Sequence, residues 1–189
     1  VVYGSEALGG VIHMRTKDPK LLGDSKKKIL FNNNTFTRFS SVNNELTGHM
    51  DFSFGWKKFG SLTSLTYSDF KDLRMGNVGN PFSDGLTRDE FHVERIDNID
   101  TMILNENRNI QDQSGYEQID ALQKFIFKPT NKVTHRLNIQ FSTTSDVPRY
   151  DRLQEKSGDF PKFAEWYYGP QNRIMTSYSF RIAAERKMY

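Results

Sequence analysis

The sequence contains no cysteine, which excludes disulfide bonds and thiolate metal sites. Long hydrophobic runs are also missing, and no stretch approaches the roughly 18 apolar residues that a membrane-spanning helix needs. Any membrane crossing would have to use β-strands, because only helices and closed barrels satisfy the backbone polar groups inside lipid. A soluble protein and a β-barrel both remain possible.

The charge is nearly balanced, with 26 basic and 23 acidic residues giving a net charge of +3. The single basic run, at residues 26–28, is best interpreted as a solvated strand start, so no basic stripe indicates a nucleic-acid partner. Neither a Gly-x-Ser-x-Gly elbow nor a His-Glu-x-x-His pair occurs. We therefore expect no enzyme activity, no catalytic residue, no cofactor and no resident metal.

Aromatic residues make up 13% of the chain, too many for a disordered polar polypeptide. From about residue 27, segments of roughly ten residues alternate apolar and polar positions, which is the period of a strand with one apolar and one polar face. Residues 46–56 give the clearest case, with Leu46, Gly48, Met50, Phe52, Phe54 and Trp56 on one side and Thr47, His49, Asp51 and Ser53 on the other. The other predicted strands are residues 28–38, 60–69, 116–129, 134–145 and 177–185.

The connections alternate between tight turns and long loops. Short turns are predicted at residues 57–60 and 129–132, and long loops near 70–115 and 146–173. Residues 41–44 form the first and shortest loop on the long-loop side. Short turns on one side and long loops on the other are typical of outer-membrane barrels. The fold class that we predict is all-β, an antiparallel transmembrane β-barrel segment.

A soluble β-sandwich is the competing interpretation, in which the rings fill a dry core. In a barrel, Trp56 and the pair Phe125 and Phe127 would instead lie in an aromatic girdle at the membrane interface. The barrel interpretation also requires apolar side chains on one wall to point toward lipid. The side chains that test this are Phe52, Phe54, Phe141 and Phe180.

Residues 2–17, VYGSEALGGVIHMRTK, resemble the end of the plug domain in TonB-dependent outer-membrane receptors. The motif residues are Tyr3, Gly4, Ser5, Gly9 and Gly10. Glycines permit close backbone approaches, so they would let a plug strand lie against a barrel wall. Further similarity at residues 68–76, 145–152 and 165–170 extends the resemblance over nearly the whole chain.

The resemblance implies that residues 1–19 are the C-terminal end of a plug and residues 20–189 the N-terminal part of a barrel with about six of roughly 22 strands. The chain starts without Met and without a charged segment before an apolar run, so we expect an internal fragment. The resemblance further implies that the protein lies in the bacterial cell outer membrane. The expected partners are membrane lipid and a TonB complex, which would bind a part of the protein upstream of this chain. The implied function is energy-driven import of an iron complex, siderophore or haem.

In such receptors the ligand is captured by outer loops and the plug apex. The loop residues that suit an anionic, aromatic iron chelate are His92, Arg74, Arg88, Arg149, Tyr150, Trp166 and Tyr167. His92 is the preferred haem ligand, whereas His49 should face the barrel interior. For each of these residues the simpler role is packing of one loop on another, and for His92 a hydrogen bond within its loop. A passive porin and a soluble β-sandwich binding module remain as alternative functions.

Overall fold

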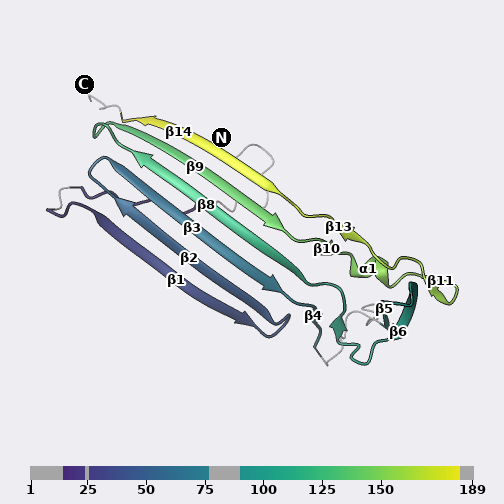
Figure 1. The fold of residues 1–189 in the computed structure, drawn as a ribbon. Helices are drawn as coiled ribbons and strands as arrows, with labels where there is room; N and C mark the ends of the chain where they lie inside the picture. The colour runs from purple at the N-terminus through teal and green to yellow at the C-terminus, as the bar shows by residue number, and fades with distance from the viewer. Residues whose placement is uncertain (1–14, 24–25, 77–89, 184–189) are drawn as a thin grey trace, which may run out of the picture.

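A large antiparallel sheet dominates the computed structural model, which describes residues 15–23, 26–76 and 90–183. Six strands form this sheet in chain order, each hydrogen-bonded to the next (Figure 1). They are β1 (Leu30–Ser40), β2 (Glu45–Gly55), β3 (Phe59–Phe70), β8 (Tyr116–Phe127), β9 (Val133–Thr144) and β14 (Arg173–Ile182). Among the described residues β1 and β14 are not paired with each other, so the sheet is open.

The connections alternate in length as predicted. Residues 56–58 and 128–132 join strands at one end of the sheet, and residues 41–44, 71–115 and 145–172 join them at the other. We call these the short-turn end and the long-loop end. The long connections are drawn together beyond the sheet in Figure 1.

The long connections, predicted as loops, contain short strands and a short helix. In the first, β4 (Leu73–Arg74) pairs with β7 (Ile110–Gln111), and β5 (Phe91–Ile96) pairs with β6 (Ile99–Leu104). The second contains β10 (Val147–Pro148), α1 (Tyr150–Leu153), β11 (Lys156–Ser157), β12 (Phe160–Pro161) and β13 (Tyr167–Tyr168). None of the helices in the described part is long and apolar enough to cross a membrane.

The strand register separates the sheet into two faces. Facing pairs such as Phe31 with Phe54 and Phe59 with Phe127 lie on one side, and Asp51 with Ser64 on the other. We define the apolar face by Phe31, Met50, Phe52, Phe54, Phe59, Leu65, Ile119, Phe125, Phe127, Leu137, Ile139, Phe141, Ile174, Tyr178, Phe180 and Ile182. The polar face is defined by Asn34, Thr47, His49, Asp51, Ser53, Ser64, Thr66, Gln118, Asp120, Lys124, Arg136, Asn138, Gln140 and Ser142. This division matches the predicted alternation.

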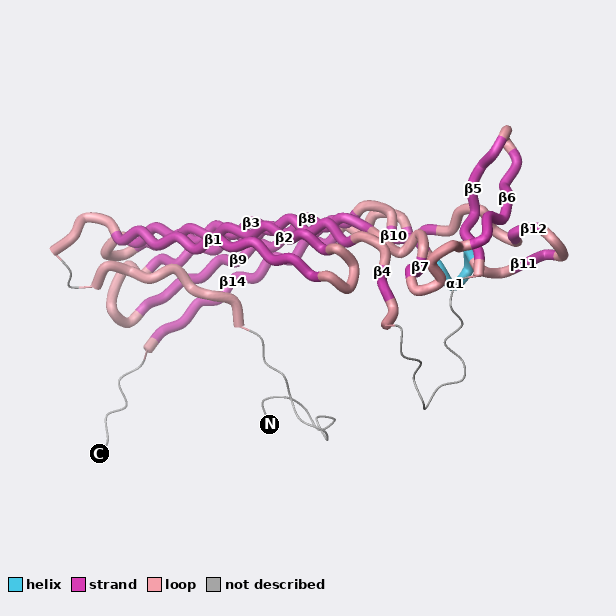
Figure 2. Tube along the Cα trace, turned by 90° about the horizontal axis from the view of Figure 1, so that it is seen from below, coloured by secondary structure: helices cyan, strands magenta, loops and turns pink. Residues whose placement is uncertain are grey.

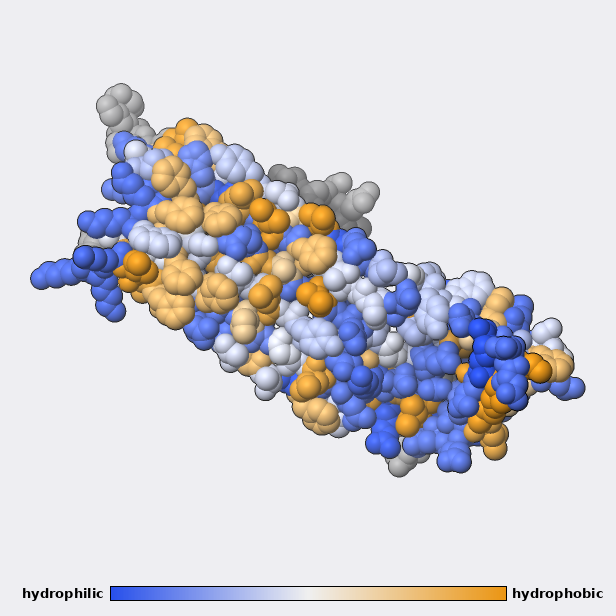
Figure 3. Space-filling model, in the orientation of Figure 1, coloured by the Kyte–Doolittle hydropathy of each residue, from blue (hydrophilic) through white to orange (hydrophobic). Residues whose placement is uncertain are grey.

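The apolar face is not covered by any described residue. Phe31 is 56% exposed, Phe180 53% and Phe141 39%, and no described side chain of the molecule is fully buried. Figure 3 shows hydrophobic side chains gathered over the sheet on this face. The rings of Phe52, Phe54, Phe141 and Phe180 therefore share an open surface and do not converge on a dry interior, as the barrel interpretation requires.

The N-terminal segment, residues 15–23, runs along the polar face without regular structure, and Figure 2 shows the coil on that side of the sheet. The apolar and β-branched run at residues 11–16 would suit a short strand. Arg15 and Thr16 are not in a strand, and residues 11–14 lie outside the described part. Side-chain contacts with the sheet hold this segment in place.

Candidate functional site

The polar face anchors the N-terminal segment through Asp51. The Lys17 ammonium lies 2.9 Å from the Asp51 carboxylate, which also accepts a hydrogen bond of 3.1 Å from the Asn34 amide. His49 contacts the same carboxylate oxygen at 3.3 Å and the Thr66 hydroxyl at 2.7 Å. The location of His49 on the polar face agrees with the prediction. A buried carboxylate needs such partners, since its desolvation is otherwise costly.

A second anchor is built around Lys124. Its ammonium, on a side chain only 8% exposed, donates to the Thr16 carbonyl at 3.1 Å, to the Thr16 hydroxyl at 2.6 Å and to Asp18 at 3.0 Å. Arg136 approaches the other Asp18 oxygen at 3.4 Å. Lys17 and Asp18 are neighbours in sequence but pair with opposite charges from different strands. We call these two sets of contacts the polar clamp.

A pair of glycines lets the segment approach the sheet. Gly55 of β2 and Gly60 of β3 face each other across the strands. A Cβ on Gly55 would overlap the carbonyl oxygen of Lys20, and a Cβ on Gly60 would lie 3.0 Å from the Leu21 side chain. The Leu22 amide then donates to the Trp56 carbonyl at 3.1 Å. Close approach to backbone requires glycine at position 55, whereas a Cβ at position 60 would need a small shift of the Leu21 or Pro19 side chain.

Close approach to the sheet was predicted for Gly4, Gly9 and Gly10 and not for this pair; those three glycines lie outside the described residues, together with Tyr3 and Ser5. The sequence does carry a signal for this pair, because two glycines flank a three-residue turn and alternation places both on the polar face.

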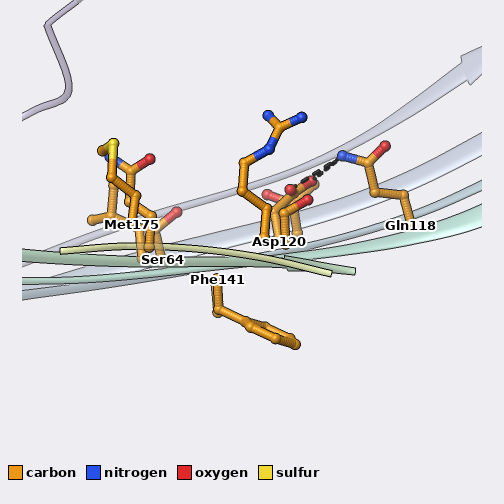
Figure 4. Close-up of a pocket in the computed structure, with 11 residues that line it drawn as sticks. Ser64, Gln118, Asp120, Phe141 and Met175 are labelled. Carbon is orange, nitrogen blue, oxygen red and sulfur yellow. Dashed lines mark hydrogen bonds between the residues drawn. The ribbon is translucent and has the colours of Figure 1, made fainter. Parts of the chain in front are cut away.

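Next to the clamp, the polar face is hollowed into a shallow cavity of about 390 Å³ (Figure 4). The Gln118 amide donates to both carboxylate oxygens of Asp120, at 3.1 and 2.9 Å. Ser64 and Met175 lie on the same side, while Phe141 points to the opposite face. The cavity is wide and open, so a hydrated polar group or a further polypeptide segment would fit it.

The two long connections pack on each other around a small core of Phe91, Val93 and Leu153, all buried. The Gln154 amide donates to the Phe91 carbonyl at 2.7 Å, and the Lys156 ammonium lies 5.0 Å from the centroid of the Phe91 ring. We call this unit the loop cluster. Its polypeptide comes from both predicted long loops, which are thus a single packed body.

Arg149 has its partners inside the loop cluster. Its guanidinium donates to Asp151 at 2.8 Å and to the Tyr168 hydroxyl at 2.6 Å, and its backbone amide donates to the Trp166 carbonyl at 2.9 Å. Asp151 holds the pKa of Arg149 above its usual value, and Arg149 in return lowers the pKa of the Asp151 carboxyl. Arg152 lies 5.7 Å from the centroid of the Trp166 ring. Arg149 and Trp166 are thus engaged in the loop packing that was the alternative to ligand binding.

His92 of β5 lies between carboxylates. Its Nε2 atom is 2.9 Å from Glu94, and its Nδ1 atom is 3.9 Å from Asp112. Burial, aided by the negative charge of Asp72, raises the pKa of the Asp112 carboxyl. Both ring nitrogens thus already have acidic neighbours.

The remaining predicted ligand residues are spread over the long-loop end. Arg74 lies in β4 and is exposed, while Tyr150 and Tyr167 are exposed in the second connection. Arg88 lies outside the described residues. Arg149, Tyr150, Trp166 and Tyr167 lie together, because Pro148 pairs with Tyr167. Their role in ligand capture stays a prediction.

Comparison with family models, with curated proteins and with solved structures finds no match to this chain. Within the residues that the structure describes, no group of three or more histidine and acidic side chains is arranged to hold a metal ion. The fold defines the class: an open antiparallel β-sheet with one exposed apolar face and one polar face that binds the N-terminal segment.

Proposed function

We propose that this chain is a segment of a transmembrane β-barrel whose apolar face contacts lipid. The observation that carries the proposal is the exposed apolar face across all six strands, opposite a polar face that binds the chain's own segment. The six strands have 10 to 12 residues. A tilted strand of about 9–11 residues crosses a bilayer, so their length suits this role.

The same proposal extends to the transport function. The barrel belongs to an outer-membrane receptor that binds an iron complex, siderophore or haem, and imports it with energy from the TonB complex. Support comes from the plug-like motif at residues 2–17 and from the segment that begins at its end, residues 15–23, which lies on the polar face. A passive porin would leave that face to water, so the clamped segment favours a plugged barrel.

The soluble β-sandwich is less well supported. A sandwich needs a second sheet over the apolar face. Among the described residues, the other strand pairs are two-stranded and lie beyond the long-loop end in Figures 1 and 2. They do not cover the apolar face.

Solubility tests the membrane assignment. The chain should require detergent or lipid vesicles to stay dispersed, because its apolar face would otherwise associate between copies. The measurement is size-exclusion chromatography of the refolded chain with and without detergent. A well-dispersed monomer in plain buffer would contradict the proposal.

Uptake tests the receptor assignment. In cells whose gene encoding this chain is disrupted, we expect loss of ⁵⁵Fe accumulation from a siderophore complex or from haem. The same loss is expected in intact cells treated with a proton uncoupler. Unchanged accumulation of every iron complex tried would refute import, whatever the result of the solubility test.

A further inference from the structure

Lysines from three chain segments meet at the short-turn end. The amide of Lys128 donates to the carbonyl of Lys58 at 2.7 Å, which places the turn after β8 beside the turn after β2. The hydrogen bond from Leu22 to Trp56 adds the N-terminal segment to the same place. Through these backbone contacts Lys57, Lys58 and Lys128 are held close together.

A cavity of about 730 Å³ opens among these segments. Among the described residues, its basic lining residues are Lys20, Lys57, Lys58, Lys128 and Arg136, and its acidic lining residue is Asp18. Asp18 is already paired with Lys124 and Arg136. Lys20 and Arg136 lie on the polar-face side of the sheet, whereas Lys57, Lys58 and Lys128 belong to the turns at its rim. These three turn lysines have no carboxylate partner within the described part of the chain, and we call them the lysine cluster. Like charges held together repel unless an anion lies between them.

An aromatic band crosses the apolar face at the same end. Phe54 stacks near Trp56 with ring centroids 6.2 Å apart, Trp56 lies 5.8 Å from Phe59, and Phe59 lies 5.9 Å from Phe125. On the far strands His135 accepts or donates a hydrogen bond of 2.7 Å with the Tyr178 hydroxyl. Trp56 is also the first residue of the turn that carries Lys57 and Lys58. The aromatic band and the lysine cluster thus meet at one rim.

We propose that the lysine cluster binds the phosphate of an anionic glycerophospholipid whose acyl chains lie against the aromatic band. The inference rests on the proposed membrane location and adds a ligand class to it. A strongly hydrated ammonium binds a phosphate as a point charge, and several exposed lysines near a membrane surface add their attractions. Aromatic rings favour the membrane interface, next to the headgroups. An acidic protein would neutralise the lysines but would not account for the adjoining aromatic band.

The test measures binding of the full chain to vesicles by flotation. One set of vesicles is pure phosphatidylcholine, and the other contains one fifth phosphatidylglycerol. We expect binding to the anionic vesicles to be at least tenfold tighter at low salt, and this preference should shrink as salt screens the charges. The triple variant Lys57→Gln, Lys58→Gln, Lys128→Gln should lose most of the preference while still binding neutral vesicles.

The matched control removes three charges at the long-loop end, with Arg108→Gln, Lys156→Gln and Lys162→Gln. It should keep the preference, and circular dichroism checks that both variants retain the sheet. Equal losses in the two triple variants would refute the lysine cluster as the site. Loss of the preference in millimolar inorganic phosphate, but not in chloride of equal ionic strength, would assign the cluster to free phosphate instead of lipid. Failure to bind either kind of vesicle would refute the membrane location itself, a different outcome from neutral binding without preference.

Discussion

Replacing Gly55 by alanine should release the N-terminal segment from the sheet. The added Cβ would overlap the carbonyl oxygen of Lys20, a backbone atom that cannot rotate away as a flexible side chain would. The segment must therefore shift, and the Leu22 hydrogen bond to Trp56 lies two residues beyond the clash. Overpacking of this kind costs roughly 1–3 kcal/mol.

That cost predicts a rise of about 5- to 150-fold in the population with the segment displaced, since each 1.4 kcal/mol is a factor of ten. The absence of cysteine gives a clean assay. A single Leu22→Cys reporter, at a position where the native side chain is 8% exposed, is labelled in detergent with a water-soluble maleimide. The labelling rate should rise in the Gly55→Ala background by the same factor.

Gly48 provides the matched control, because it lies in the same strand β2 and a Cβ there would meet nothing within 4 Å. Gly48→Ala should leave the labelling rate at Cys-substituted position 22 unchanged within about twofold, since the added methyl touches no part of the segment and a compatible Gly→Ala change acts mainly through the unfolded chain. Equal rates in the two alanine variants would refute the close-approach argument. So would an unchanged rate in Gly55→Ala.

Two further predictions concern the charged contacts. Lys124→Met should also expose the segment, with a labelling increase of about tenfold at position 22. The Thr16 carbonyl and Asp18 then lose a buried charged donor worth roughly 1–3 kcal/mol. Lys28→Met, at an exposed lysine, is the control, and equal labelling rates in the two variants would contradict the polar clamp. In the loop cluster, Arg149 lowers the pKa of Asp151, so this pair stabilises the fold above the ordinary carboxyl pKa of about 4 and the contribution disappears as the pH falls through the lowered value. Fluorescence of the neighbouring Trp166, in a Trp56→Phe background, should therefore change in acid, and the Asp151→Asn variant should lack that part of the change.

Much of the sheet could be predicted from the sequence, because strand periodicity acts locally and repeats. The positions of Phe52 and Asp51 on opposite faces follow from alternation alone. The turn that joins β1 and β2 at residues 41–44 was placed correctly for the same reason. The hairpin of β5 and β6 was missed, although Asp97 and Asn98 have positive φ angles of 50° and 63° and suit a tight hairpin turn. The alternating runs of β5 and β6 are short and lie within a mainly polar stretch, which was therefore predicted as loop.

The loop cluster could not be predicted, since its contacts join residues far apart in the chain. Arg149 was selected as a ligand residue by its type, but its partners Asp151 and Tyr168 depend on how the loop folds back. Alternation alone places Lys124 on the polar face and says nothing of its burial. Its burial depends on Thr16 and on the path of the N-terminal segment, which strand periodicity does not describe.

The chemistry of the polar clamp bears on the proposed transport. Separating an apolar contact exposes hydrocarbon to water, at about 25 cal/mol for each Å². When the clamp opens, Asp51 and Lys124 exchange protein partners for water, and the net cost of each such hydrogen bond is only about 0.5–1.5 kcal/mol, or up to about 3 kcal/mol when a charge is involved. The glycine pair at Gly55 and Gly60 removes side chains that would otherwise interlock with the segment. A segment held by ion pairs and hydrogen bonds over a wall without interlocking side chains is therefore stable at rest and still separable under a pulling force, which is the property that the proposed importer would need where plug and barrel meet.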